Sequence, residues 1–165
     1  MNTFKNIIAQ KPVFPILFLC LVSTAMHWQI FTTVLVGVHV WRQSQTQINI
    51  QNFVRHDFNI MNPRNNFIFG VSNIKRFEFP VMQWLIAAAG KIFGESITVT
   101  RISMFLIGIA CIIGIFFLLK AVLKDNSVAF LGAWAFNFSP LFYYYTMNPL
   151  PDLFALCCTV WYMSF

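Results

Sequence analysis

Long apolar runs constrain this chain more than any other feature of its sequence. Runs at about residues 12–31, 98–119 and 128–147 each reach the roughly 20 residues that a helix needs to cross a bilayer. A fourth run begins at residue 153 and is still apolar where the sequence ends. Of the 165 residues, 58% are hydrophobic and only 10% are charged, which leaves too little polar surface for a soluble domain. The sequence therefore predicts an all-α fold, a polytopic integral membrane protein with several transmembrane helices.

Three details of these runs bear on their extent. Residues Ser23–Ala25 faintly resemble a signal-peptide cleavage site, but the apolar character continues to Val40, which favours an uncleaved anchor. In the third run Pro140 predicts a kink, and Tyr143–Tyr145 fits an aromatic belt at the membrane–water interface. The fourth run reaches Phe165 without a polar anchor, so we expect this chain to be the amino-terminal part of a longer protein.

An external loop at about residues 39–97 contains two predicted interfacial helices. The first, Gln45–Asp57, is amphipathic, and its polar side is expected to be wet at the membrane surface. The second, Pro80–Phe93, is too short to span; Pro80 suits its first position and Gly94 ends it. The expected faces of the first helix are Thr46, Ile50, Phe53 and Val54 (apolar) and Gln45, Asn49, Asn52 and His56 (polar). Those of the second are Val81, Met82, Leu85, Ile86, Ile92 and Phe93 (apolar), with Gln83 and Lys91 opposite.

Most of the few charged side chains fall in this external loop. Carboxylates there can act as general bases, and cations can hold phosphate oxygens. The loop cations are Arg42, Arg55, Arg64, Lys75 and Arg76. The net charge of +6 is not gathered in a basic stripe, so it favours phospholipid headgroups or a phosphorylated ligand over nucleic acid. A solvated loop that faces lipid headgroups is the alternative explanation for the same charges.

No cofactor is indicated by the sequence. The three His residues, at positions 27, 39 and 56, do not have metal-ligand spacing, and the four Cys residues lie inside apolar runs. The sequence also contains no P-loop, nucleophile elbow or dinucleotide fingerprint. We therefore expect neither a metal nor an organic cofactor.

Eight short motifs follow one another between His39 and the end of the chain. They read HVWRQSQT, QNF, NPR, EFP, KIFG, TRISM, FSP and PDLFA. Together they resemble the amino-terminal module of GT-C membrane glycosyltransferases, in the branch of protein O-mannosyltransferases and the aminoarabinose transferase that acts on lipid A. The resemblance implies transfer of a sugar from a polyprenyl-phosphate-linked donor to an extracytoplasmic acceptor. It also implies a cytoplasmic amino terminus and, for a bacterial protein, the cytoplasmic (inner) membrane.

The resemblance also implies which carboxylates take part. Glu78 in EFP and Asp152 in PLPD match acidic residues beside the active site of relatives. The family commonly has an acidic base early in the first external loop, where this chain has Gln45, and a neutral amide cannot act as a base. Asp57 or Glu78 would then be the base. The candidate catalytic residues are therefore Glu78, Asp152 and Asp57.

The donor phosphate would be held by cations of the loop. The enzyme that acts on lipid A has a lysine where this chain has Phe79, so Lys75 or Arg76 would substitute for it. Amide side chains can bind sugar hydroxyls because they both donate and accept hydrogen bonds. The candidate substrate-binding residues are Arg42, Gln43, Gln45, Asn49, Arg64, Lys75 and Arg76.

Two other functions are compatible with the sequence. The neutral Gln45 and the abrupt end at Phe165 favour a truncated, non-catalytic membrane protein that binds polyprenyl lipid or a partner. A transporter fragment would carry charges inside its spans, whereas the three complete runs hold only Arg101, near one end. The sequence identifies neither the sugar nor the acceptor.

Overall fold

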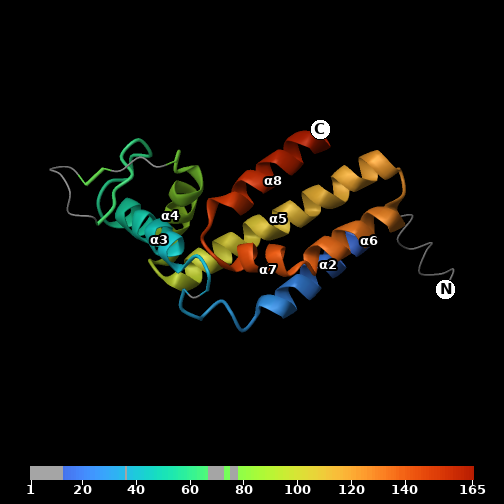
Figure 1. Ribbon diagram of the computed structural model, residues 1–165, viewed down its shortest axis with the longest axis horizontal. Coiled ribbons are helices and arrows are strands. Elements are labelled where there is room, and N and C mark those ends of the chain that lie inside the picture. The colour runs from blue at the N-terminus through green and yellow to red at the C-terminus, as the bar shows by residue number, and fades with distance from the viewer. Residues whose placement is uncertain (1–12, 36, 67–72, 75–77) are drawn as a thin grey trace.

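A computed structural model describes residues 13–35, 37–66, 73–74 and 78–165 of the chain. Its helices are α2 (Val13–His27), α3 (Val40–Arg55), α4 (Val81–Phe93), α5 (Ile97–Leu123), α6 (Asn126–Asn137), α7 (Pro140–Met147) and α8 (Pro151–Ser164). Within the described ranges the only other regular pairing is an isolated antiparallel bridge between Arg64 and Ile74. The molecule is elongated, with α3 and α4 at one end and the other five helices in a bundle (Figure 1). The all-α prediction is confirmed for the described part of the chain.

Helix α5 is the central element of the bundle. It has 27 residues, so its length is about 40 Å at 1.5 Å per residue. It packs against α8, α6 and α7 along the bundle and against α4 at its start (Figure 1). Ser96 caps its first turn by accepting a hydrogen bond from Val99 N (3.1 Å). In the described ranges, α5 is the one helix whose length and composition suffice to cross a membrane.

The other predicted spans are shorter or divided in the structure. In the run 12–31, α2 has 15 residues and ends at His27, after which the chain forms turns that lead to α3. The run 128–147 is two helices, α6 and α7, because Phe138–Ser139 leaves the helical conformation. Pro140 has no backbone N–H to donate, so it begins α7 in the first turn and does not kink a continuous helix. The prediction of several membrane spans therefore stays a prediction.

Helices α3 and α4 occupy the places of the two predicted interfacial helices. Helix α3 begins at Val40, well before the predicted start at Gln45. Helix α4 ends as predicted at Gly94, whose φ of +94° is readily adopted only by glycine. Pro80 is the N-cap residue of α4 and not its first helical residue. The two helices pack closely at Gly90, where an added Cβ would lie 3.1 Å from the Val54 side chain.

The predicted polar face of α3 is wet only in part. Asn49 and Asn52 are at most 9% exposed, whereas Gln45 is half-buried and His56 is exposed. The prediction was wrong for the two asparagines because the loop after α3 folds back over them, and the backbone carbonyl of Arg64 accepts their hydrogen bonds. Sequence periodicity indicates which residues share a helical face, but it does not indicate whether water or another segment covers that face.

The predicted faces of α4 are also partly wrong. Met82 and Ile86 are buried against neighbouring helices as expected, but Gln83 is buried with them at 4% exposure. Ile92 and Phe93 are 75% and 76% exposed. The buried side of α4 is therefore rotated towards Gln83, which brings this amide close to the site described next.

Candidate functional site

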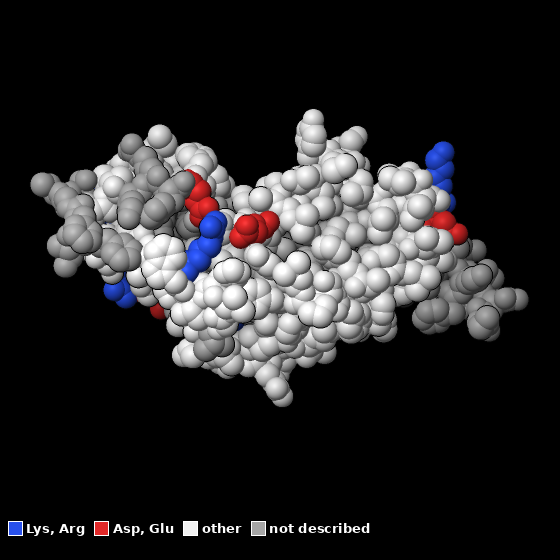
Figure 2. Space-filling view, in the orientation of Figure 1, with Lys and Arg blue, Asp and Glu red and all other residues white. Residues whose placement is uncertain are grey.

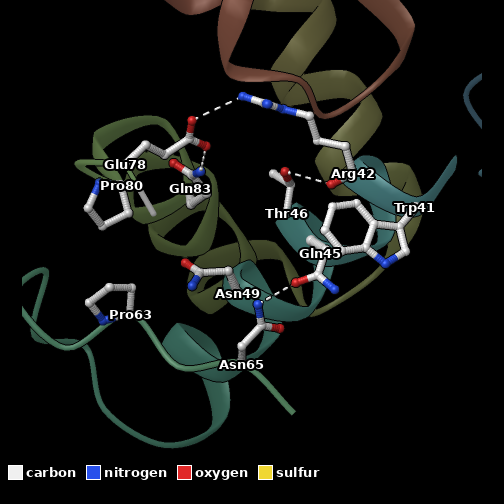
Figure 3. A pocket seen from close by; sticks show the side chains of 10 residues that line it. All are labelled: Trp41, Arg42, Gln45, Thr46, Asn49, Pro63, Asn65, Glu78, Pro80 and Gln83. Carbon is white, nitrogen blue, oxygen red and sulfur yellow. Dashed lines mark hydrogen bonds and ion pairs between the residues drawn. The ribbon is translucent and has the colours of Figure 1, made fainter. Parts of the chain in front are cut away.

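A cavity of about 290 Å³ opens between α3, α4 and the loop after α3. Figure 3 shows side chains from all three segments facing it. Its lining combines charged, amide and aromatic side chains, which gives it both donors and acceptors. The lining residues are Trp41, Arg42, Gln45, Thr46, Asn49, Pro63, Asn65, Glu78, Pro80 and Gln83.

An ion pair lies at the edge of this cavity. Arg42 Nη2 donates to Glu78 Oε2 (3.1 Å), and Gln83 Nε2 donates to Glu78 Oε1 (3.0 Å), as Figure 3 shows. The side chains of Arg42 and Glu78 are 50% and 38% exposed, so both remain accessible to a ligand. An exposed pair of this kind contributes little to stability. The pair is therefore available for binding or chemistry and is not needed to hold the fold.

Tyr144 of α7 fixes the first turn of α3, which carries Arg42. The Tyr144 hydroxyl accepts hydrogen bonds from Gln43 Nε2 (2.9 Å) and from His39 N (3.2 Å). Gly37, with φ of +115°, lies so close that an added Cβ would be 3.0 Å from the Tyr144 ring. Tyr144 thus has an internal partner, whereas the sequence predicts an aromatic belt at the membrane surface.

Amides form the floor of the cavity. Nδ2 of Asn49 and of Asn52 both donate to the backbone carbonyl of Arg64 (3.2 and 3.0 Å), which holds the loop against α3. Asn65 Nδ2 donates to Gln45 Oε1. The Oδ1 atoms of Asn49 and Asn65 are buried and have no hydrogen-bond partner. The floor therefore has acceptor capacity that the protein itself does not use.

Asp57, a candidate base, has a local structural role and does not line the cavity. The side-chain amide of Asn62 (2.9 Å) and the backbone N–H of Asn59 (3.0 Å) donate to its carboxylate. These two hydrogen bonds, and to a smaller extent the charge of Arg64, lower the pKa of Asp57. Asp57 therefore holds the loop after α3, and of these two candidate bases Glu78 is the one that lines the cavity.

Asp152 lies in the first turn of α8 and lines a different cavity from Glu78. That second cavity, of about 300 Å³, is mostly apolar and includes Phe136, Phe142 and Tyr145. Figure 2 shows acidic and basic side chains gathered where the α3–α4 end meets the bundle; the middle of the bundle is uncharged on this face, and further charged side chains appear at its far end.

Of the four remaining predicted substrate-binding residues, two are described by the structure and do not line the cavity with their side chains, and two lie outside the described residues. Gln43 is fully buried and holds α3, so it lies behind the cavity. Arg64 contributes its backbone carbonyl to the floor, and its Nε is buried without a partner. Lys75 and Arg76 lie outside the described residues.

Several residues of the site were not foreseen from the sequence. Trp41 is 68% exposed beside Arg42, and Gln83 and Asn65 complete the lining. A large aromatic residue next to an Arg, in a segment rich in amides, was the available signal for Trp41. Asn65 gave no such signal because its role depends on how the loop folds back.

Within the described portion of the chain, no group of three or more His, Cys, Asp or Glu side chains could hold a metal ion. The expectation that the protein uses no cofactor stays a prediction.

The fold and the site define a helical protein with one apolar helix of membrane-spanning length and a polar, charged pocket beside an apolar bundle. A family model described as dolichyl-phosphate-mannose-protein mannosyltransferase matches residues 78–165, which is more than half of the chain. The chain therefore belongs to this family, a membrane-associated family of GT-C-type glycosyltransferases. No curated protein and no solved structure matches it.

The match to the family model covers only part of the site. It begins at Glu78 and includes α4 to α8 with Asp152. Helix α3, with Arg42, Gln45 and Asn49, lies before the matched segment. Glu78 is thus the first residue of the matched segment, and Arg42, which contacts it, lies before that segment.

Proposed function

We propose that this chain is the amino-terminal part of a glycosyltransferase that moves a sugar from a polyprenyl-phosphate-linked donor to an extracytoplasmic acceptor. The observation that carries the proposal is the Arg42–Glu78 pair, half exposed at a cavity whose floor is made of amides. Family membership supports glycosyl transfer and suggests a donor of this class. The amino terminus would be cytoplasmic, and the α3–α4 end would lie at the outer surface of the bacterial cytoplasmic membrane.

Arg42 would bind the donor phosphate. Breaking a sugar–phosphate bond leaves negative charge on the departing lipid phosphate, and a cation placed there stabilises the transition state. A guanidinium forms strong, charge-assisted hydrogen bonds to phosphate oxygens. Because Arg42 is paired with only one oxygen of Glu78, an arriving phosphate can take over its free N–H groups. Arg64, Lys75 and Arg76 would supply further positive charge in the same loop.

Glu78 would accept the proton of the acceptor hydroxyl. Its carboxylate lies at the edge of the cavity, where an acceptor hydroxyl can come within hydrogen-bond reach of it. Gln83, by donating to the other carboxylate oxygen, fixes the orientation of Glu78. Gln45 and Asn49 line the same cavity, and the side-chain NH2 group of Gln45, whose Oε1 accepts from Asn65, would donate to a sugar hydroxyl. Asp152 would act from the second cavity, on the acceptor side.

A non-catalytic binding protein is the second candidate. Gln45 favours it, because the position that is acidic in relatives is neutral here and its Oε1 already accepts from Asn65. Such a protein would bind polyprenyl lipid or a partner through the same cavity without transferring a sugar.

The test is transfer from a radiolabelled polyprenyl-phosphate sugar in membranes that contain the full-length protein. Glu78→Gln should reduce transfer at least about 100-fold, as expected for loss of a general base. The matched control is Glu95→Gln, since Glu95 pairs with Arg55 and does not line the cavity. Equal transfer by Glu78→Gln and the wild type would remove Glu78 from the mechanism. Donor binding without transfer by the wild type would favour the non-catalytic candidate.

A further inference from the structure

Arg101 is a buried charge at the start of α5. It is 2% exposed, and among the described Lys, Arg, Asp and Glu side chains it is the only buried one. In the sequence it lies near the end of an apolar run, a position from which an arginine side chain can reach the water at the membrane surface. The structure instead turns it inward, between α5 and two linkers.

The guanidinium of Arg101 joins two segments that are far apart in the sequence. Its Nε donates to Thr33 O (2.9 Å) and its Nη2 to Val34 O (2.6 Å), both in the linker between α2 and α3. Its Nη1 donates to Met147 O (2.7 Å), at the last residue of α7. One side chain thus connects α5 to the segment before α3 and to the segment before α8.

Burying this charge is costly, and no carboxylate offsets the cost. In the described residues the ion pairs are Arg42–Glu78 and Arg55–Glu95, so Arg101 is compensated by carbonyl oxygens alone. A cation near the beginning of a helix is also unfavourable for the helix dipole. A buried charge is weak evidence for added stability. The fork of the guanidinium, which directs N–H groups at three carbonyls, points to a geometric role.

We propose that Arg101 is a positioning residue that sets the placement of α3 relative to the start of α8. Helix α3 carries Arg42 into the cavity, and Asp152 lies in the first turn of α8. Tyr144 already joins the first turn of α3 to α7. Arg101 adds a connection from α5, so that α3 is held from two helices of the bundle. The consequence for activity depends on the proposed function; the structural consequence does not.

The structural test uses hydrogen–deuterium exchange of the full-length protein carrying Arg101→Gln. Amides of residues 28–35, 37–40, 147, 148 and 150 should exchange at least about tenfold faster, because both linkers lose their connection to α5. Amides of α6 should be unchanged. Arg101→Lys should give an intermediate effect, since an ammonium cannot reach three carbonyls in different directions. The matched control, Arg55→Gln, removes an exposed arginine and should leave both linkers unchanged.

The steady-state kinetics of the same variants distinguish a positioning role of Arg101 from a loss of folding. Arg101→Gln should reduce kcat for sugar transfer by about 10- to 100-fold with a smaller change in the donor KM, because the pocket remains but is misaligned. Arg101→Lys should recover part of kcat.

Two results would overturn the proposal for Arg101. One is unchanged exchange in both linkers; the other is faster exchange throughout the chain, α6 included, which would show a general loss of stability. If the wild type transfers no sugar at all, the proposed function fails, and the exchange data still decide the role of Arg101.

Discussion

The helical bundle and the α3–α4 end are each stabilised by a different kind of internal contact. In the bundle, α5 contacts its neighbours through apolar side chains and through glycines such as Gly108 and Gly114, which permit close approach. At the α3–α4 end, buried amides bond to backbone carbonyls, and the described ion pairs lie here. The bundle is thus closely packed, and we expect it to tolerate little change in side-chain volume. The α3–α4 end, in contrast, has polar groups to which a ligand can bind. The following predictions test that contrast.

The largest expected effect comes from the apolar contact between α3 and α4, where Phe53 is buried together with Ile50, Met82 and Ile86. Phe53 of α3 is 1% exposed, and Phe53→Ala should reduce the free energy of unfolding by about 3–5 kcal/mol. Phe93→Ala is the matched control, because Phe93 is 76% exposed and its loss should cost less than about 1 kcal/mol. Denaturant unfolding of the full-length protein in detergent micelles measures both. Equal losses would mean that the α3–α4 end has no apolar core of its own.

Two glycines test the packing of the bundle. An added Cβ at Gly108 or at Gly132 would lie 2.5 Å from a neighbouring atom, of Thr146 and of Leu119 respectively. Thr146 is held by hydrogen bonds to His27 Nε2 (2.6 Å) and Tyr143 O (2.7 Å), so it cannot move aside. Gly108→Ala should therefore cost about 1–3 kcal/mol.

Gly132→Ala is the control for this prediction. It meets the end of a flexible Leu side chain, and the gain in helix propensity of up to about 1 kcal/mol offsets the clash. The same unfolding measurement applies. A larger loss for Gly132→Ala than for Gly108→Ala would contradict the expectation that Thr146, fixed by two hydrogen bonds, yields less readily to an added Cβ than Leu119 does.

The smallest expected effect concerns the pH dependence of the loop after α3. The pKa of Asp57 is lowered in the folded protein by hydrogen bonds from Asn62 and Asn59. Its contribution to stability is therefore complete above the unfolded pKa of about 3.9 and is lost as the pH falls through the lower folded value.

Asp57→Asn should remove this acid-induced loosening. Trp84 can report it, since its Nε1 donates to Phe58 O (3.0 Å) next to Asp57. The measurement uses a variant that retains Trp84 as its only tryptophan. With Asp at position 57, the tryptophan fluorescence of this variant should change below about pH 4. An identical acid transition with Asn at position 57 would show that Asp57 does not contribute to it.

The positions of the helices were predicted better than the burial and contacts of their side chains. The long apolar run and the breakers Pro80 and Gly94 located α4 and α5 closely, whereas the run 128–147 was predicted as one kinked span and is two helices, α6 and α7. The early start of α3 was missed because His39 and Val40 continue an apolar run that hides the turn before them.

The site was predicted in part. Glu78, Arg42, Gln45 and Asn49 were candidates, and the structure brings them to one cavity. The burial of the amides could not be foreseen, because it depends on long-range contacts with the loop that contains Arg64. The inward turn of Arg101 depends likewise on carbonyls that are close only in the folded chain.

The central claim is that the cavity between α3 and α4 receives the sugar-phosphate end of the donor. A photoreactive polyprenyl-phosphate sugar, activated on membranes containing the full-length protein, tests it directly through mass spectrometry of the labelled peptides. We predict labels in residues 41–49 and 78–83 that excess unlabelled donor suppresses. Labels confined to the second cavity, in residues 136–156, would contradict the claim.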